Sequence, residues 1–139
     1  MAAFSFVPMK IIERRHGEVL VITLEGRLDG ITCPSMQRYL GELIDRGDYR
    51  VLLDCDRLAY ISSAGLRVML IAAKALRKVN GVIALSRLQS QVHDVIEIAG
   101  FHILIPIFAQ KEDAVAALEA GAEVSNPTAT ATTATIADY

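Results

Sequence analysis

The sequence has few of the residues that build disulfide frameworks or metal sites. Only two cysteines occur among 139 residues, Cys33 and Cys55, and two cysteines alone make neither a disulfide framework nor a metal cage. Cys55 lies within an apolar run, which predicts a small, buried hydrophobic residue. The three histidines, His16, His93 and His102, are far apart and show no metal-ligand spacing. We therefore predict no metal site.

Long apolar runs and a strong net charge are also missing. No uninterrupted apolar run approaches about 18 residues, the length that a membrane-spanning helix requires. The formal net charge is only -2, which excludes the strongly basic surface of a non-specific nucleic-acid binder. The first eight residues, MAAFSFVP, lack the basic start and the long apolar stretch of a secretory signal peptide. We predict a cytoplasmic protein with no membrane span and no nucleic-acid partner.

The motifs of common enzyme classes are absent. The sequence contains no Gly-x-Ser-x-Gly nucleophile elbow, no Walker loop and no Rossmann glycine triplet. Asp54 and Asp56 could suggest a magnesium or phosphoacceptor site, but the other residues of a receiver domain are missing, so we interpret them as strand-end and loop carboxylates. No acid–base or nucleophile–base pair can be assembled. We predict a protein with no catalytic residue and no cofactor, and not an enzyme.

The length suits one domain, and the order of hydrophobic patterns predicts its fold. A near-continuous apolar run such as Val19–Leu24 indicates a strand covered on both faces, whereas Met36, Leu40 and Leu43 recur at helical spacing. The expected strands cover residues 9–15, 19–24, 51–55, 82–85 and 103–108. The expected helices run from near Thr32 to Gly47, from before Leu66 to Asn80, from a capping Ser90 to Gly100, and from Lys111 to Ala120, with Gly121 after it. Pro106 is tolerated in the last strand only if that strand lies at an edge.

This order, ββαβαβαβα, predicts a single α/β domain. The turn at residues 16–18 joins the first two strands into an antiparallel hairpin, and the alternation that follows demands parallel pairing with right-handed crossovers. We expect an open mixed sheet with about four helices, formed by residues 9–121. Residues 1–8 are an N-terminal extension, and residues 122–139 are an Ala/Thr-rich tail, either disordered or added as an edge strand.

The segment Tyr60–Arg67, YISSAGLR, carries the clearest functional signal. Two serines, small residues and then an amphipathic run describe a helix N-terminus, where backbone N–H groups lack partners and the helix dipole makes the end electropositive. A serine there can simply cap the helix, or, if phosphorylated, place its phosphate on free donors. Since Ala64 and Gly65 leave room for an approaching protein, we predict a partner-binding segment that includes Ser62, Ala64, Gly65 and Arg67.

The longer stretch YISSAGLRVML resembles the signature of STAS domains, and specifically of stand-alone anti-sigma factor antagonists, which carry a Ser-(Ser/Ala/Gly)-Gly-Leu turn. The resemblance covers most of residues 9–120 and includes the Gly-x-Leu-Asp segment at 26–29 and the Gly-Phe turn at 100–101. It implies that Ser63 is phosphorylated by a partner kinase, with Ser62 as the second choice. It also implies that Asp29 lies near the serine and contacts the partner; the alternative is an aspartate that caps a turn or helix.

The resemblance implies a phosphorylation-switched binding module that regulates transcription by partner switching. The unphosphorylated form would bind an anti-sigma factor of the GHKL kinase type and release a sigma factor, and a PP2C-type phosphatase would reset the switch. Two other functions stay open. One is an unphosphorylated STAS scaffold subunit in a stressosome-like or lipid-transport ATPase complex, and the other is a sensor of small ligands or nucleotides.

Overall fold

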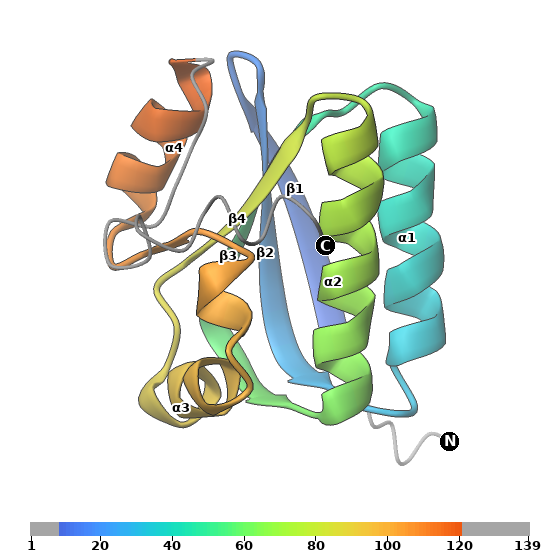
Figure 1. The fold of residues 1–139 in the computed structure, drawn as a ribbon, viewed down its shortest axis with the longest axis vertical. Helices are drawn as coiled ribbons and strands as arrows, with labels where there is room; N and C mark the ends of the chain where they lie inside the picture. The colour runs from blue at the N-terminus through green and yellow to red at the C-terminus, as the bar shows by residue number, and fades with distance from the viewer. Residues whose placement is uncertain (1–8, 121–139) are drawn as a thin grey trace.

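The computed structural model describes residues 9–120, and within them a mixed β-sheet is covered by helices (Figure 1). The strands are β1 (Met9–His16), β2 (Val19–Leu28), β3 (Arg50–Ile61), β4 (Val82–Ser86) and β5 (Ile107–Phe108). The helices are α1 (Cys33–Asp45), α2 (Ser63–Lys78), α3 (Ser90–Ile98) and α4 (Lys111–Glu119), with a 3-10 turn η1 (Phe101–Ile103). The predicted order ββαβαβαβα is confirmed. Gly121 and the predicted extension 1–8 and tail 122–139 lie outside the described residues.

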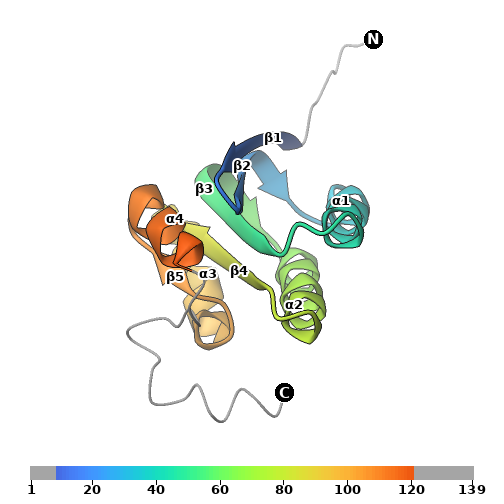
Figure 2. The ribbon, with the colours of Figure 1, turned by 90° about the horizontal axis from the view of Figure 1, so that it is seen from above.

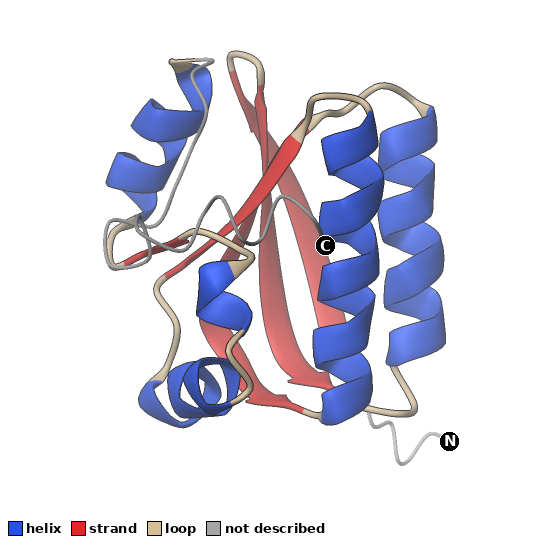
Figure 3. Ribbon diagram, viewed as in Figure 1, coloured by secondary structure: helices blue, strands red, loops and turns tan. Residues whose placement is uncertain are grey.

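The strands, drawn in red in Figure 3 and labelled in Figure 2, follow one another across the sheet in the order β1-β2-β3-β4-β5. β1 and β2 pair antiparallel, and the turn between them uses Gly17 at a φ of +58°, a conformation that glycine adopts without strain. The pairs β2–β3, β3–β4 and β4–β5 are all parallel. The prediction of a hairpin followed by parallel strands is therefore confirmed.

Helices cover both faces of the sheet, as the apolar run in β2 predicted. Leu20, Ile22 and Leu24 belong to the larger buried cluster, which the apolar sides of α1, α2 and α3 complete. Val19 and Val21 alternate with them and pack with α4 on the opposite face (Figure 2). Cys55 is completely buried in the larger cluster, and this burial raises the pKa of its thiol.

The two central strands are longer than the apolar runs indicate. β2 continues to Leu28 and β3 to Ile61, beyond the predicted strand ends at residues 24 and 55. The extra residues pair with each other in parallel, with two register shifts between Thr23 and Arg27. Gly26 lies between these shifts at a φ of +116°, where a residue with a Cβ would be strained. Pairing between neighbouring strands, which hydrophobic pattern does not report, produces this extension.

Two predictions near the C-terminal half are wrong. The last strand is not Ile103–Phe108 but only Ile107–Phe108, preceded by η1. Pro106 has no N–H to donate, but its carbonyl accepts a hydrogen bond of 2.9 Å from the Leu85 amide, beside the edge strand β5. Ser90 is not the cap of α3: Gln89 occupies the cap position, without a side-chain cap hydrogen bond, and Ser90 is the first helical residue.

Candidate functional site

The ends of β2 and β3 bring two helix starts together. Leu28 and Ile61 are paired in parallel register, and the Ser62 amide donates a 2.9 Å hydrogen bond to the Leu28 carbonyl. Parallel neighbours end at the same edge of a sheet, so the loop that leads into α1 lies beside the turn that leads into α2. This edge is at the bottom of Figure 1. The topology therefore places the Asp29 loop next to the two serines.

Ser62 caps α2. Its backbone is extended, with φ -97° and ψ 174°, and its hydroxyl oxygen accepts a 3.2 Å hydrogen bond from the Gly65 amide. Its carbonyl accepts the first helical hydrogen bond from Leu66 at 3.0 Å. The capping interpretation of the serine pair is thus confirmed for Ser62, which is half-buried and whose hydroxyl is already engaged.

Ser63 is the first residue of α2 and is exposed. It lies among the helix-start amides that have no partner inside the helix. Ala64 and Arg67 are also exposed, and Arg67 follows Ser63 by four residues, which places it on the same side of the helix one turn further on. Three of the predicted site residues therefore share one accessible surface.

Gly65 has a different role from the one expected. It is buried, and a Cβ added to it would lie 2.9 Å from the Leu28 carbonyl oxygen and 2.8 Å from Cγ1 of Ile61. The absence of a side chain thus makes room for the end of β2 and not for another protein. Gly65 thus allows the start of α2 to pack closely against the end of β2. This packing fixes the position of the preceding residue, Ser63, relative to the sheet.

The Asp29 carboxylate caps the turn that leads into α1. Its Oδ1 accepts hydrogen bonds from the amides of Thr32, at 3.2 Å, and Ile31, at 3.0 Å. These two bonds, with help from the nearby Arg27, lower the pKa of Asp29. The alternative of an aspartate that caps a turn is confirmed, whereas the cap position of α1 itself is occupied by Thr32. Among the described residues no hydrogen bond joins Asp29 to Ser63. Asp29 therefore contributes negative charge beside the serine turn while its oxygens order the α1 loop.

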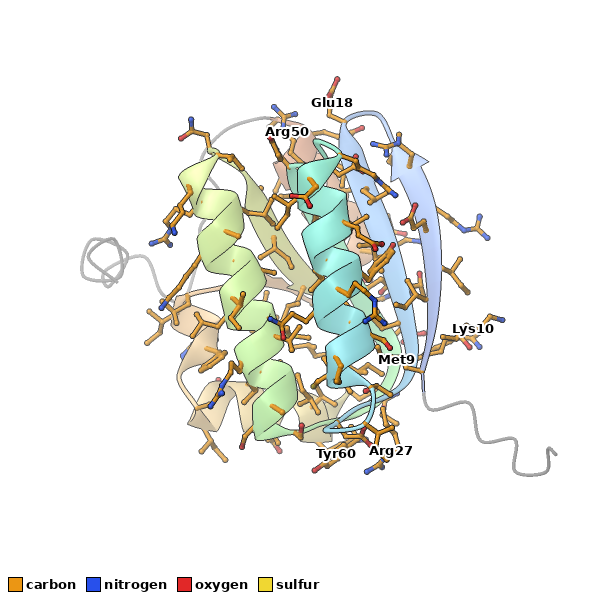
Figure 4. All side chains as sticks on the ribbon, turned by 90° about the vertical axis from the view of Figure 1, so that its right-hand side faces the viewer. Met9, Lys10, Glu18, Arg27, Arg50 and Tyr60 are labelled. Atoms are coloured by element: carbon orange, nitrogen blue, oxygen red, sulfur yellow. The ribbon has the colours of Figure 1, made fainter. Side chains whose placement is uncertain are left out.

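Sequence reasoning missed three residues of this surface. The Arg27 guanidinium lies 4.2 Å from the centre of the Tyr60 ring, and its Nε is 3.5 Å from Oδ2 of Asp29 (Figure 4). Ile31, at the tip of the α1 loop, is 72% exposed, and Tyr60 is 40% exposed. A large exposed apolar side chain beside a charged cluster is typical of a binding surface. Arg27 lies inside the Gly-x-Leu-Asp segment and Tyr60 begins the YISSAGLR segment, so both stand in stretches that the sequence singled out, whereas Ile31 offered no such signal.

Asp54 and Asp56 were interpreted as strand-end and loop carboxylates, and both lie instead within β3. Asp54 is buried and receives two hydrogen bonds from Arg87, at 3.0 and 2.7 Å, and a third from Ser86 at 3.3 Å. The bond to Asp54 raises the pKa of Arg87. Asp56 is exposed. A carboxylate bound in this way to an arginine serves the fold and leaves no acid or base for catalysis.

The comparison with known families now decides the identity of the fold. The family model of the STAS domain matches residues 10–114. The chain belongs to the STAS domain family. Among residues 9–120, no helix is long and apolar enough to cross a bilayer.

Relatives of this STAS domain are anti-sigma factor antagonists. BtrV of Bordetella bronchiseptica, provisionally named an anti-sigma factor antagonist, is 39% identical over 111 residues, which cover 80% of this chain and 96% of BtrV. Family membership and this similarity confirm the prediction of a binding module and not an enzyme.

Solved structures show the same fold at lower identity. An anti-sigma factor antagonist from Mycobacterium paratuberculosis superimposes with a TM-score of 0.73 at 19% identity, covering 80% of this chain and 94% of that one. The anti-sigma factor antagonist SpoIIAA in its unphosphorylated form superimposes with a TM-score of 0.70 at 21% identity, covering 80% and 97%.

Proposed function

We propose that this STAS domain is an anti-sigma factor antagonist whose partner binding is switched by phosphorylation of Ser63. The observation that carries the proposal is the position of Ser63, exposed as the first residue of α2 beside the Asp29 loop. The partner is an anti-sigma factor of the GHKL kinase type, which binds the unphosphorylated form and thereby releases a sigma factor. Such partners place the protein in the cytoplasm.

Ser63 is a better acceptor than Ser62 for a structural reason. The Ser62 hydroxyl is half-buried and accepts the Gly65 amide, so a phosphate on Ser62 would replace the cap of α2. Ser63 is exposed and can enter a kinase active site without unwinding the helix. In the transfer, the Ser63 oxygen bonds to the γ-phosphorus of ATP, ADP leaves, and the hydroxyl proton passes to a base of the kinase. This chain supplies only the acceptor oxygen.

Phosphorylation changes the charge of the docking surface more than its shape. A phosphoserine adds about -1.5 to -2 charges at pH 7. In the free protein the start of α2 stabilises this charge, because its backbone N–H groups and dipole favour anions. In a complex, the same group would be desolvated close to the Asp29 carboxylate, which is costly without new cationic partners. Phosphorylation therefore weakens partner binding with little refolding, until a PP2C-type phosphatase hydrolyses the ester.

The docking surface consists of exposed residues around Ser63 together with the half-buried Asp29. We assign to it Asp29, Ala64 and Arg67 from the predicted site, and we add Ile31 and Arg27 from the structure. Ile31 provides apolar area, and the arginines provide hydrogen-bond donors for an acidic or polar partner surface. Residues 9–121 form the functional unit in this proposal, so removal of residues 1–8 and 122–139 leaves partner binding intact.

Mass spectrometry with the cognate anti-sigma factor and Mg-ATP tests the acceptor. The intact wild-type chain should gain one phosphate, Ser62→Ala should also gain one, and Ser63→Ala should gain none. Addition of one phosphate to Ser63→Ala would overturn the assignment.

Binding assays with the same anti-sigma factor test the switch. Ser63→Ala should bind like the unmodified wild type, whereas Ser63→Glu, which carries a charge there, should bind about tenfold more weakly or worse. A stable complex that is indifferent to ATP and to Ser63→Glu would contradict the switch and favour an unphosphorylated scaffold subunit.

A further inference from the structure

Three side chains able to bind a metal gather on α3. His93, Asp94 and Glu97 each offer one ligand atom, and these atoms all lie within 4.8 Å of one another. His93 and Glu97 are four residues apart, and Asp94 and Glu97 three, the spacings at which helical side chains meet. Asp94 and Glu97 are exposed and His93 is half-buried, so rotation of these side chains can bring their ligand atoms to about 2.0–2.2 Å from one shared ion.

The donor set selects the class of ion. One imidazole nitrogen and two carboxylate oxygens suit Zn²⁺, which binds histidine together with aspartate or glutamate. Calcium and magnesium prefer oxygen ligands throughout. Contrary to the sequence prediction of no metal site, we propose that His93, Asp94 and Glu97 form a Zn²⁺ site on the surface of α3, with water completing the coordination.

The surroundings have room for the ion, and the arginine that lines them is paired with carboxylates. His93 and Glu97 line a cavity of about 360 Å³, which His102 and Arg87 also line. The Arg87 guanidinium is the cationic group in this wall, but it is bound to Asp54 at 2.7 Å and lies 4.0 Å from Asp56. Its charge is offset by these two carboxylates, so the carboxylates of Asp94 and Glu97 are available to attract a cation.

Of the other cysteines and histidines in the described part of the chain, His102 lines the same cavity as His93, whereas Cys33, Cys55 and His16 are unfavourably placed for zinc. The thiols of Cys33 and Cys55 are both buried, and burial raises the pKa of each, which keeps them protonated. His16 is exposed at the end of β1, on a different element from the site. His16 therefore provides a matched control for a solitary surface histidine.

Calorimetric titration of the untagged, chelator-stripped full chain with ZnCl₂ at pH 7.5 tests the site. We expect one ion per chain for the wild type and for His16→Ala, and affinity losses of about tenfold or more for His93→Ala and for Glu97→Gln. CaCl₂ should bind more weakly than ZnCl₂, with an affinity that His93→Ala leaves unchanged. Circular dichroism of each variant confirms that α3 is still folded.

Two results would overturn the site. One is the absence of a stoichiometric zinc-binding event in the wild type. The other is a folded His93→Ala variant that binds zinc as tightly as the wild type, which would mean general attraction to acidic side chains. The site does not depend on Ser63, so the stripped protein should still accept phosphate, and failure of either proposal leaves the other standing.

Discussion

Arg27 links Asp29 to Tyr60. Its guanidinium lies 4.2 Å from the centre of the Tyr60 ring, and its Nε lies 3.5 Å from the Asp29 carboxylate. Arg27 and Tyr60 are register partners on β2 and β3, the two strands that lead to the two helix starts. One side chain thus ties the loop before α1 to the strand that leads into Ser62 and Ser63, and it keeps the carboxylate of Asp29 in the cluster.

Asp29 should make stability depend on acid pH. Its amide hydrogen bonds hold its folded pKa below the unfolded value of about 3.9. Its contribution to stability is therefore complete above that value and is lost as the pH falls through the folded pKa. Glu13 acts in the same direction, because the hydrogen bond from Tyr39 lowers its pKa. The free energy of unfolding should decrease as the pH drops below about 4.

Urea denaturation between pH 2.5 and 7 measures this dependence. Asp29→Asn, whose amide oxygen can still accept the Thr32 and Ile31 amides, should show a flatter decline than the wild type. An identical decline in the variant would mean that the Asp29 carboxylate does not gain stability on ionisation.

The two neighbouring serines should differ in their effect on stability. Ser62→Ala removes the oxygen that accepts the Gly65 amide and should lower the free energy of unfolding by about 1 kcal/mol. Ser63→Ala, at an exposed first helical position, should change it by less than about 0.5 kcal/mol. Chemical denaturation of both variants at pH 7 measures the two changes in the free energy of unfolding. Equal losses would contradict the assignment of Ser62 as the cap.

Two helical glycines should respond to alanine in opposite directions. Gly65→Ala places a Cβ 2.9 Å from the Leu28 carbonyl oxygen, and we expect a loss of about 1–3 kcal/mol from this overpacking. Gly41, inside α1, has nothing within 4 Å of an added Cβ, so Gly41→Ala should gain about 0.5–1 kcal/mol from helix propensity. Thermal unfolding of both variants measures the difference, and a stabilised Gly65→Ala would contradict the close approach of α2 to β2.

The ion pair between Arg87 and the buried Asp54 should contribute more to the free energy of unfolding than the exposed pair Arg57–Glu25. Arg87→Met leaves the buried Asp54 carboxylate without its two arginine hydrogen bonds, and we expect a loss of about 3 kcal/mol. Arg57 is 68% exposed and 4.0 Å from Glu25, so Arg57→Met should cost less than about 1 kcal/mol. Urea denaturation compares the two, and similar losses would show that Asp54 is satisfied without Arg87.

Hydrophobic pattern predicted the elements better than their ends. The strands and helices occur in the expected order, because buried runs and helical spacing mark elements that are packed on one or both faces. The ends of β2 and β3 were not predictable, since Arg27 and Tyr60 extend the strands by pairing with each other while staying exposed. The last strand was overestimated, because the apolar stretch at 103–105 packs as a turn and not as part of the sheet.

The serine turn was predictable as a helix start, because small polar residues ahead of an amphipathic run are a local signal. The contacts of Asp29, Arg27 and Ile31 were not, since they depend on how closely two loops from different strands approach. Gly65 shows the same limit: its sequence position suggested open space, and only the packing against Leu28 reveals that the space is filled. Asp54 required the position of Arg87, 33 residues away.

The two outer strands of the sheet have a consequence for assembly. β5 offers two residues beside a proline, and β1 carries Lys10, Glu13, Arg14 and Arg15 along its length. Short or heavily charged borders resist backbone pairing with a foreign chain. A protein partner is therefore expected to bind the exposed ends of the helices and not to add a strand to the sheet. For the same reason, copies of the domain at high concentration should not aggregate by pairing of their edge strands.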